Sequence, residues 1–382
     1  MRVAYVVHRA VAGMSPDEVL DRWPTMVRTL DALARRGVEP VAVCATDGGA
    51  TRLERNGVRY HFVHDDSRSR SSLARAVGAL APDVVHVNGF VFPVPTMALR
   101  VACGRRPAIV VQHHGEAPAQ GRTLIAQRLA ARIIDGGLFT GANEQARPFV
   151  AAGALRSGAA AAEVLEASAD LVPIERRMAR LRTAMRGDPA VIWVGRLNDG
   201  KDPVTAVRAF AALARRAPDA QLWMLYQDAT LERDVHDALR IADADADADG
   251  DAHPELDDRV HLVGAVPHDE MAAWFSSADI ALSTSRHEAA GFSLLEALAC
   301  GCTPVVTDIA PHRAIVGNLG RRFAPGDIDG AATALATVDV LDRAVVRDDF
   351  ERRLSWHEVA RQLLVAYETA LARRSPPVRC RE

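Results

Sequence analysis

The chain has 382 residues, too many for one hydrophobic core, so we expect two domains of roughly 170 to 200 residues each. With 49% hydrophobic and 25% charged residues and a formal net charge of -3, the composition is that of a globular protein that needs no nucleic-acid partner. No apolar run reaches the ~20 residues of a membrane span, and the five cysteines form neither a disulfide framework nor a zinc motif, which favours a reduced, cytoplasmic protein.

Short β-branched runs alternate with helical patterns through residues 1–170. Strands are predicted at 2–7, 40–45, 58–63, 83–88, 108–113 and 137–141, and helices near 19–36, 70–80, 122–134 and 143–151. The same residues carry 20 arginines against 16 acidic side chains. This mild positive excess favours an anionic substrate or a peripheral contact with the inner face of a membrane.

A charged segment, 171–190, separates this array from a second one. The second array repeats the plan, with strands predicted at 191–195, 221–226, 260–264, 280–284 and 304–308. Apolar runs of this length, each followed by a helix, indicate parallel strands buried on both faces. We therefore predict an α/β protein of two doubly wound, Rossmann-like domains, residues 1–170 and 187–355, followed by an amphipathic helix over 356–374.

An Asp-Ala repeat, ADADADADGDA, occupies residues 242–252. It resembles the start of a calcium loop, but the closing glutamate position holds Leu256, and Pro254 interrupts the loop. We therefore predict a solvated, low-complexity loop and no metal site.

Lysine occurs once in the chain. Of the 46 basic residues, 45 are arginine, and Lys201 is the single lysine. Such a bias replaces lysine wherever charge alone matters, so Lys201 indicates a position that needs a compact ammonium with three donors, unless it is a chance survivor. Lys201 and Arg196 both lie in RLNDGKDP, directly after the strand predicted at 191–195.

Charged residues also follow the strand predicted at 280–284. The stretch HEAAGFSLLEALACG contains Glu288 and Glu296, and a helix is predicted to begin near Gly291–Ser293. Ligands of open parallel sheets bind at the carboxyl ends of the strands. Two cations and a helix N-terminus suit a diphosphate, and carboxylates accept hydrogen bonds from sugar hydroxyls. A sugar nucleotide meets both demands. The absence of G-x-G-x-x-G after the first strand and of G-x-x-x-x-G-K-[ST] disfavours a dinucleotide dehydrogenase and a P-loop NTPase.

These motifs resemble a known family. VGRLNDGKDP, the segment 260–308 and the His-Gly of VVQHHGE are similar to the retaining glycosyltransferases of family 4, which carry a Glu-x7-Glu motif. The match is strong over residues 187–330 and looser before them. It implies the GT-B fold, in which two Rossmann-like domains face each other across a cleft. The first domain would face the acceptor, the second would bind the nucleotide sugar, and the last helix would cross back to the first.

The resemblance also implies roles for single residues. In the second domain, Arg196 and Lys201 would bind the donor diphosphate, Glu296 the ribose hydroxyls and Glu288, as a catalytic residue, the donor sugar. The backbone amides of Gly291, Phe292 and Ser293 would contact the phosphate and the sugar. In the first domain, His114 would face the donor sugar as a second catalytic residue, and the backbone at Gly13 would lie close to the diphosphate. No metal and no cofactor is expected beyond a nucleotide sugar, whose base (UDP, GDP or ADP) is open.

Three functions stay open. The first is a metal-independent retaining glycosyltransferase with an unidentified glycan, lipid or small-molecule acceptor. The others are a sugar-nucleotide 2-epimerase-like enzyme and a non-catalytic sugar-nucleotide-binding protein. The third is motivated by EAAGF in place of the family's Glu-Gly and by YQDAT in place of its Gly-x-Gly.

Structural explanations compete with some of these roles. Ser293 and Glu296 have the spacing of a capping box, which alone would explain Glu296. His113 rivals His114 as the functional histidine. Gly13 could simply serve a turn.

Overall fold

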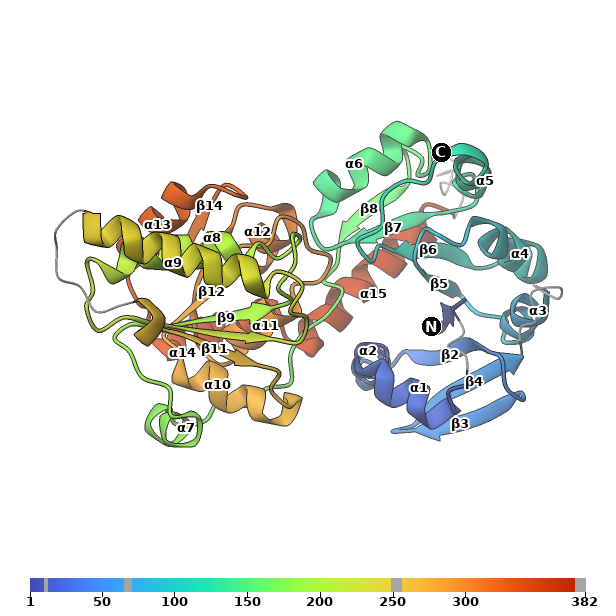
Figure 1. The fold of residues 1–382 in the computed structure, drawn as a ribbon. Helices are drawn as coiled ribbons and strands as arrows, with labels where there is room; N and C mark the ends of the chain where they lie inside the picture. Colours follow the sequence, from blue (N-terminus) through green and yellow to red (C-terminus); the bar gives the residue numbers. More distant parts are fainter. Residues whose placement is uncertain (10–12, 65–70, 249–255, 375–382) are drawn as a thin grey trace, which may run out of the picture. The chain divides into compact units, whose positions relative to one another are not determined.

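The computed structural model describes residues 1–9, 13–64, 71–248 and 256–374 (Figure 1). Within them the chain forms two compact units. The first unit joins Met1–Ala167 to the segment that begins at Trp356, and the second is the continuous segment Ser168–Ser355. Each unit is a mainly parallel sheet covered by helices, which confirms the predicted class of two Rossmann-like α/β domains.

The sheet of the first unit has the order β3-β4-β2-β1-β5-β6-β7-β8, and its neighbours are parallel except for the pair β3 and β4. Its strands are β1 (Arg2–Val7), β2 (Glu39–Thr46), β3 (Thr51–Arg55), β4 (Val58–His64), β5 (Val84–Asn88), β6 (Ala108–Gln112), β7 (Gly136–Phe139) and β8 (Ala160–Glu163). Its helices are α1 (Pro16–Arg22), α2 (Pro24–Arg35), α3 (Ser71–Ala79), α4 (Pro93–Cys103), α5 (Gly121–Ala130), α6 (Ala142–Ala152) and α15 (Trp356–Ala372).

The sheet of the second unit is parallel throughout, in the order β11-β10-β9-β12-β13-β14. Its strands are β9 (Ala190–Gly195), β10 (Gln221–Tyr226), β11 (Val260–Gly264), β12 (Ile280–Ser283), β13 (Thr303–Thr307) and β14 (Arg321–Phe323). Its helices are α7 (Arg176–Thr183), α8 (Pro203–Ala214), α9 (Glu232–Ala248), α10 (Met271–Ser277), α11 (Phe292–Ala299), α12 (Ala310–Val316), α13 (Ile328–Thr337) and α14 (Arg343–Arg353), with 3₁₀ turns at Leu256–Asp258 and His268–Glu270.

Both faces of the second sheet are buried, as the apolar strands predict. Alternate residues of β9 enter two separate clusters, Val191 and Trp193 on one face and Ala190 and Ile192 on the other. Helices α8, α9 and α13 cover the first face, while α10 and α11 contribute to the second. The central strands are therefore packed on both faces, and their carboxyl-terminal loops start from the buried core.

Helix α15 belongs to the first unit. It packs against α2, β6, β7 and β8, and it buries Val359, Leu363 and Tyr367, as expected for the amphipathic helix predicted over 356–374. The hydroxyl of Tyr367 lies 2.7 Å from Nδ1 of His86, a buried residue of β5. The last helix is thus an integral layer of the first unit.

Some predicted elements differ from the structure. The helix predicted over 19–36 is two helices, because the proline at position 24 opens a new first turn at α2. The loop predicted for the Asp-Ala repeat is wrong as far as residue 248, since α9 continues through Ala248; the rest of the repeat lies outside the described residues. Alanine's high helix propensity favours this extension.

Two negative findings concern the described ranges only. No helix there is both long and apolar enough to cross a lipid bilayer. No group of three or more His, Cys, Asp or Glu side chains there is arranged to hold a metal ion.

Candidate functional site

The second unit has a switch in strand order between β9 and β12. From β9 the chain adds strands on one side of the sheet, and from β12 it adds them on the other. Ligands of doubly wound sheets bind beyond the carboxyl ends of the strands at such a point. The loop after β9 carries Arg196 and Lys201, and the loop after β12 carries Glu288.

Lys201 and Glu288 are in direct contact. Lys201 Nζ forms an ion pair with Glu288 Oε1, with 26% and 12% of the two side chains exposed. The hydroxyl of Ser285 donates to the same carboxylate oxygen at 2.8 Å. Two donors therefore converge on Oε1, and the pair sits in a partly desolvated position where its attraction is stronger than on an open surface.

Buried hydroxyls fix the backbone beneath this pair. Thr284 Oγ1 lies 2.8 Å from the carbonyl oxygen of Lys201 and accepts from Trp193 Nε1 at 3.0 Å. Thr307 Oγ1 donates to the carbonyl oxygen of Ser285 at 2.6 Å. Both threonines are fully buried, so the two loops are tied to each other and to the core.

Arg196 opens the loop after β9 and is exposed. Among the described residues no ion pair or side-chain hydrogen bond engages its guanidinium. The next residue, Leu197, is buried and donates its amide to the carbonyl oxygen of Asp228 at 2.8 Å, which anchors the backbone. The loop is thus fixed while the arginine is available to an anion.

Helix α11 begins where the sequence predicts, but its cap is different. Gly291 is the N-cap, at φ 64°, and no side chain of the described residues caps the helix. The capping box of Ser293 and Glu296 is therefore wrong, because the left-handed glycine starts the helix before the serine. A Cβ at Gly291 would lie 2.8 Å from Ile315 Cδ1. The first amides of α11, from Phe292 and Ser293, remain without a side-chain acceptor and suit an anion.

Glu296 has a partner that the sequence does not predict. Its Oε1 lies 2.7 Å from Nε2 of His268, with side chains 17% and 76% exposed. Burial raises the pKa of the Glu296 carboxyl above its usual value, and His268 partly opposes that shift. The signal that points to His268 is its place just after the strand predicted at 260–264, at the same edge of the sheet.

His114 of the first unit lies in a network of polar side chains. Its Nδ1 is 2.5 Å from Glu166 Oε1, and its Nε2 is 2.9 Å from Asn88 Oδ1. Asn88 Oδ1 also accepts from the hydroxyl of Tyr5 at 2.9 Å, while Asn88 Nδ2 donates to the Val6 carbonyl oxygen. This orientation leaves an acceptor facing each ring nitrogen, an arrangement that favours the imidazolium.

The pKa of His114 is raised accordingly. Burial, the largest single influence, lowers it, but the hydrogen bond and charge of Glu166 and the charge of Glu116 together outweigh burial. Glu166 is a residue that the sequence analysis missed. It lies 52 positions from His114, just after β8, and because no strand is predicted at β8 the sequence offers no signal for it.

The structure distinguishes His113 from His114 by burial and by hydrogen-bond partners. His113 is buried, its Nε2 lies 2.9 Å from the Glu116 carbonyl oxygen, and its ring packs against Phe139. It is therefore an interior histidine with its own partners.

Gly13 lies in the loop after β1 with φ 75°, and its amide donates to Asp47 Oδ2 at 3.0 Å.

Replacing Glu166 with glutamine is expected to lower the pKa of His114, because the neutral amide removes the favourable charge. A raised folded-state pKa stabilises the native unit fully below the ordinary histidine pKa, and this stabilisation is lost as the pH rises through the raised value. The stability difference between the native protein and Glu166→Gln should therefore be largest between the ordinary carboxylate and histidine pKa values, and it should shrink as the pH rises through the raised His114 pKa. NMR titration of the imidazole nitrogens and unfolding at several pH values measure both effects.

The matched control is Glu163→Gln, which removes an exposed carboxylate at the end of β8. It should leave the His114 titration unchanged. An unchanged His114 titration in Glu166→Gln would contradict the role given to the carboxylate.

Comparisons with known proteins show the family of the chain. The family model described as glycosyl transferases group 1 matches residues 188–339, and the model described as glycosyltransferase family 4 matches residues 25–140. The two parallel-sheet α/β units define a protein of the GT-B class. The chain belongs to the family 4-like glycosyltransferases.

Curated relatives and solved structures are similar to this chain. A D-inositol 3-phosphate glycosyltransferase of Paenarthrobacter aurescens is 28% identical over 52% of this chain, and the match spans about half (49%) of that relative's length. A GDP-mannose:cellobiosyl-diphosphopolyprenol alpha-mannosyltransferase of Xanthomonas campestris is 26% identical over 79% of each chain. A glycosyltransferase structure from Rickettsia africae superposes with a TM-score of 0.70 at 14% identity, covering 97% of this chain and 98% of that one, which supports the fold.

Proposed function

We propose that the protein is a retaining glycosyltransferase that moves a sugar from a nucleotide-diphosphate sugar to an acceptor without a metal ion. The observation that carries the proposal is the Lys201–Glu288 pair at the strand-order switch of the second unit. A cation for a phosphate and a carboxylate for a sugar hydroxyl lie side by side there. Membership of the glycosyltransferase family supports the same conclusion.

The reaction needs stabilisation of a departing phosphate. The bond between the anomeric carbon and the diphosphate oxygen breaks, a bond to the acceptor oxygen forms, and the proton of the acceptor hydroxyl passes to the leaving diphosphate. Negative charge grows on the leaving diphosphate. We assign its stabilisation to Arg196, Lys201 and the uncapped amides at the start of α11, which are fixed before the reaction begins.

Further residues would hold the parts of the donor that do not react. We assign Glu296, one turn into α11, to the ribose hydroxyls, and Glu288 to the donor sugar. In the first unit, Glu166 favours the imidazolium of His114, whose Nε2–H faces Asn88 Oδ1 in this structure and would be donated to a sugar oxygen when the donor binds. Gly13 leaves the backbone after β1 unobstructed, since a Cβ there would meet nothing within 4 Å.

The acceptor is proposed only as a class. One relative is named for D-inositol 3-phosphate, and another for a GDP-mannose donor and a diphosphopolyprenol-linked acceptor. These names support a nucleotide-sugar donor and a hydroxyl-bearing acceptor, either a small phosphorylated polyol or a lipid-linked glycan.

Titration with UDP, GDP and ADP, followed by transfer assays with the matching sugar nucleotides, tests the proposal. We expect one nucleoside diphosphate to bind, transfer to continue in the presence of a chelator, and the product to keep the anomeric configuration of the donor, as measured by NMR of the anomeric proton.

Other outcomes would select other functions. Failure of all three nucleotides to bind would contradict the proposal. Binding with conversion of the free sugar nucleotide to its 2-epimer would indicate an epimerase. Binding without hydrolysis, transfer or epimerisation across a broad acceptor panel would indicate a non-catalytic sugar-nucleotide-binding protein.

A further inference from the structure

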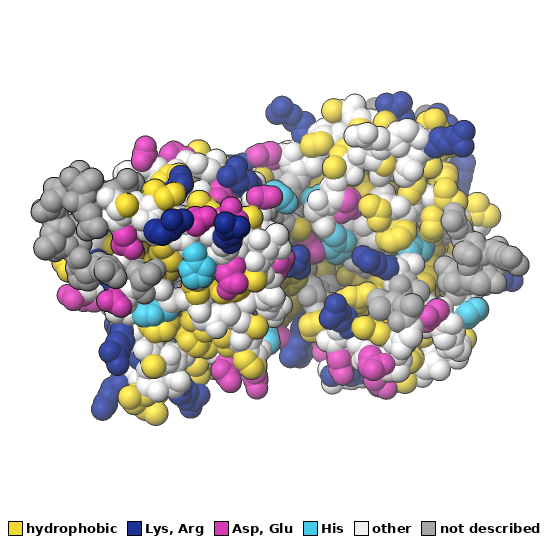
Figure 2. Space-filling view, in the orientation of Figure 1, with side chains coloured by type: hydrophobic (Ala, Val, Ile, Leu, Met, Phe, Trp, Pro, Cys, Tyr) yellow, Lys and Arg dark blue, Asp and Glu magenta, His cyan; other side chains and the backbone are white. Residues whose placement is uncertain are grey.

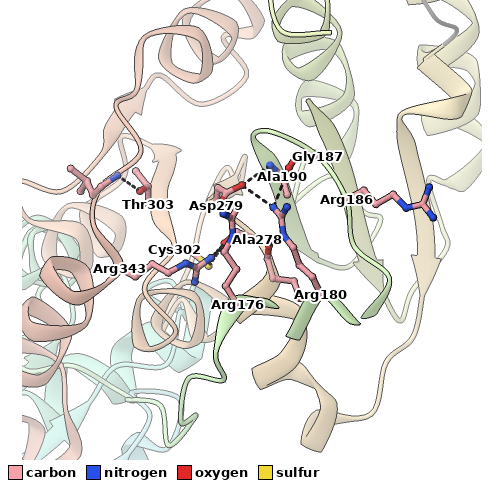
Figure 3. Close-up of polar contacts among 12 residues, drawn as sticks. Arg176, Arg180, Arg186, Gly187, Ala190, Ala278, Asp279, Cys302, Thr303 and Arg343 are labelled. Carbon is pink, nitrogen blue, oxygen red and sulfur yellow. Dashed lines mark hydrogen bonds and ion pairs between the residues drawn. The ribbon is translucent and has the colours of Figure 1, made fainter. Parts of the chain in front are cut away.

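One face of helix α7 in the second unit is attached to the body of that unit by ion pairs and hydrogen bonds. Arg176 forms an ion pair with Asp279 Oδ1, and Arg180 Nη2 lies 3.1 Å from Asp279 Oδ2 (Figure 3). Thr183 Oγ1 lies 2.9 Å from the hydroxyl of Ser277, at the end of α10. Asp279 is only 8% exposed, so this face is fixed against the body of the unit and its charges are matched.

The opposite face of α7 is formed by Arg177, Met178, Leu181 and Arg182. These positions follow the i, i+1, i+4, i+5 spacing of one helical face, and all four residues are exposed. Met178 and Leu181 are 48% and 69% exposed, with an arginine on each side. We call these four residues the outer face of α7.

Neighbouring residues extend this surface. Val172, just before the helix, is 72% exposed, and Arg186, just after it, is also exposed and points away from the Asp279 cluster in Figure 3. Figure 2 shows dark blue arginines around hydrophobic side chains at the end of the second unit where α7 lies. The nearby Glu175 carboxylate is engaged as the helix cap, accepting from the amides of Arg177 and Met178.

We propose that the outer face of α7 binds the surface of an anionic lipid bilayer. A helix that lies on such a surface places apolar side chains between the headgroups and basic side chains against the lipid phosphates. The outer face has two apolar side chains, Met178 and Leu181, flanked by two arginines, and it contains no acidic residue. A neutral apolar partner would leave the arginines unmatched.

A second copy of the chain fits this surface poorly. Two outer faces brought together would oppose arginine to arginine. The outer face is also much smaller than the interface of a stable dimer, which has roughly 20 residues on each side. The membrane proposal is also independent of the sugar chemistry, since none of these residues lies in the Lys201–Glu288 site.

Vesicle flotation with the full chain tests the proposal. We expect the protein to float with vesicles of phosphatidylcholine and phosphatidylglycerol, to remain behind with phosphatidylcholine alone, and to be released as salt screens the charges. The double variant Arg177→Gln/Arg182→Gln should bind the anionic vesicles much more weakly, by roughly 5-fold for each arginine lost. Met178→Ser/Leu181→Ser should also weaken flotation.

Matched controls use the same unit. Arg208→Gln and Val345→Ser replace an exposed arginine of α8 and a 54% exposed valine of α14, and both should bind as the native protein does. Absence of flotation with anionic vesicles, or native binding by both double variants, would overturn the proposal. Binding to soluble heparin without binding to vesicles would overturn it in favour of a soluble polyanion. Nucleoside-diphosphate titration of the same variants separates these results from failure of the proposed function.

Discussion

Replacing Lys201 with arginine is expected to lower sugar transfer by about 10² to 10³-fold, the range seen when one oxyanion-stabilising donor is lost. The charge is kept, but the ammonium is held in a partly buried position against Glu288, with Ser285 on the same carboxylate oxygen. A planar guanidinium is larger and presents its donors in a fixed fork, so it would displace this arrangement. Steady-state kinetics with the identified donor, and titration with its nucleoside diphosphate, measure the effect.

The control for this change is Arg208→Lys on α8, which exchanges the same two residue types at an exposed position. It should leave kinetics and nucleotide binding unaltered. Native turnover and binding in Lys201→Arg would show that charge alone matters at this position, and that the single lysine is a chance survivor.

Replacing Asp279 with alanine is expected to destabilise the second unit by roughly 2 to 4 kcal/mol. Loss of one partner of a fully buried ion pair costs about 3 to 5 kcal/mol, and the estimate here is lower because Arg176 keeps 41% of its side chain exposed. The same substitution removes the acceptor of the Ala190 amide, at 2.9 Å, at the start of β9. Unfolding of the full chain, followed by hydrogen exchange of amides in the second unit, measures the loss.

The matched change is Asp237→Ala, which breaks a surface pair with Arg240 on α9. Exposed pairs of this kind contribute at most about 1 kcal/mol. Equal destabilisation by the two substitutions would contradict the anchoring role of Asp279.

The fold was predictable where burial dominates the sequence. Strands such as β9 and β10 are apolar runs flanked by turns, so both arrays and their order could be inferred. The strand β3 was missed because it is a partly exposed edge strand with arginine and glutamate, and only the Asn56-Gly57 turn before β4 marks the hairpin. The short β8 and β14 were also missed, since a few residues give too little periodicity.

The site was predictable to the level of loops. Arg196, Lys201 and Glu288 each follow a strand. The carboxyl ends of parallel strands lie at the same edge of the sheet, so loops that follow them are neighbours even when their exact conformations are unknown. The partners of the site residues were not predictable, because they depend on loop geometry. Neither His268 beside Glu296 nor Glu166 beside His114 has a fixed spacing from its partner. The capping box failed for a related reason, since the spacing of Ser293 and Glu296 does not reveal that Gly291 has already begun the helix.

The position of α15 has a consequence for biosynthesis. The second unit is continuous in the chain, whereas the first contains a helix made only after the second unit is complete. Domains generally fold as units during synthesis, the earlier one first. Here the earlier segment must wait, with His86 lacking its hydrogen-bond partner, until the helix that bears Tyr367 leaves the ribosome. The segment translated second is thus the first able to reach its complete native packing.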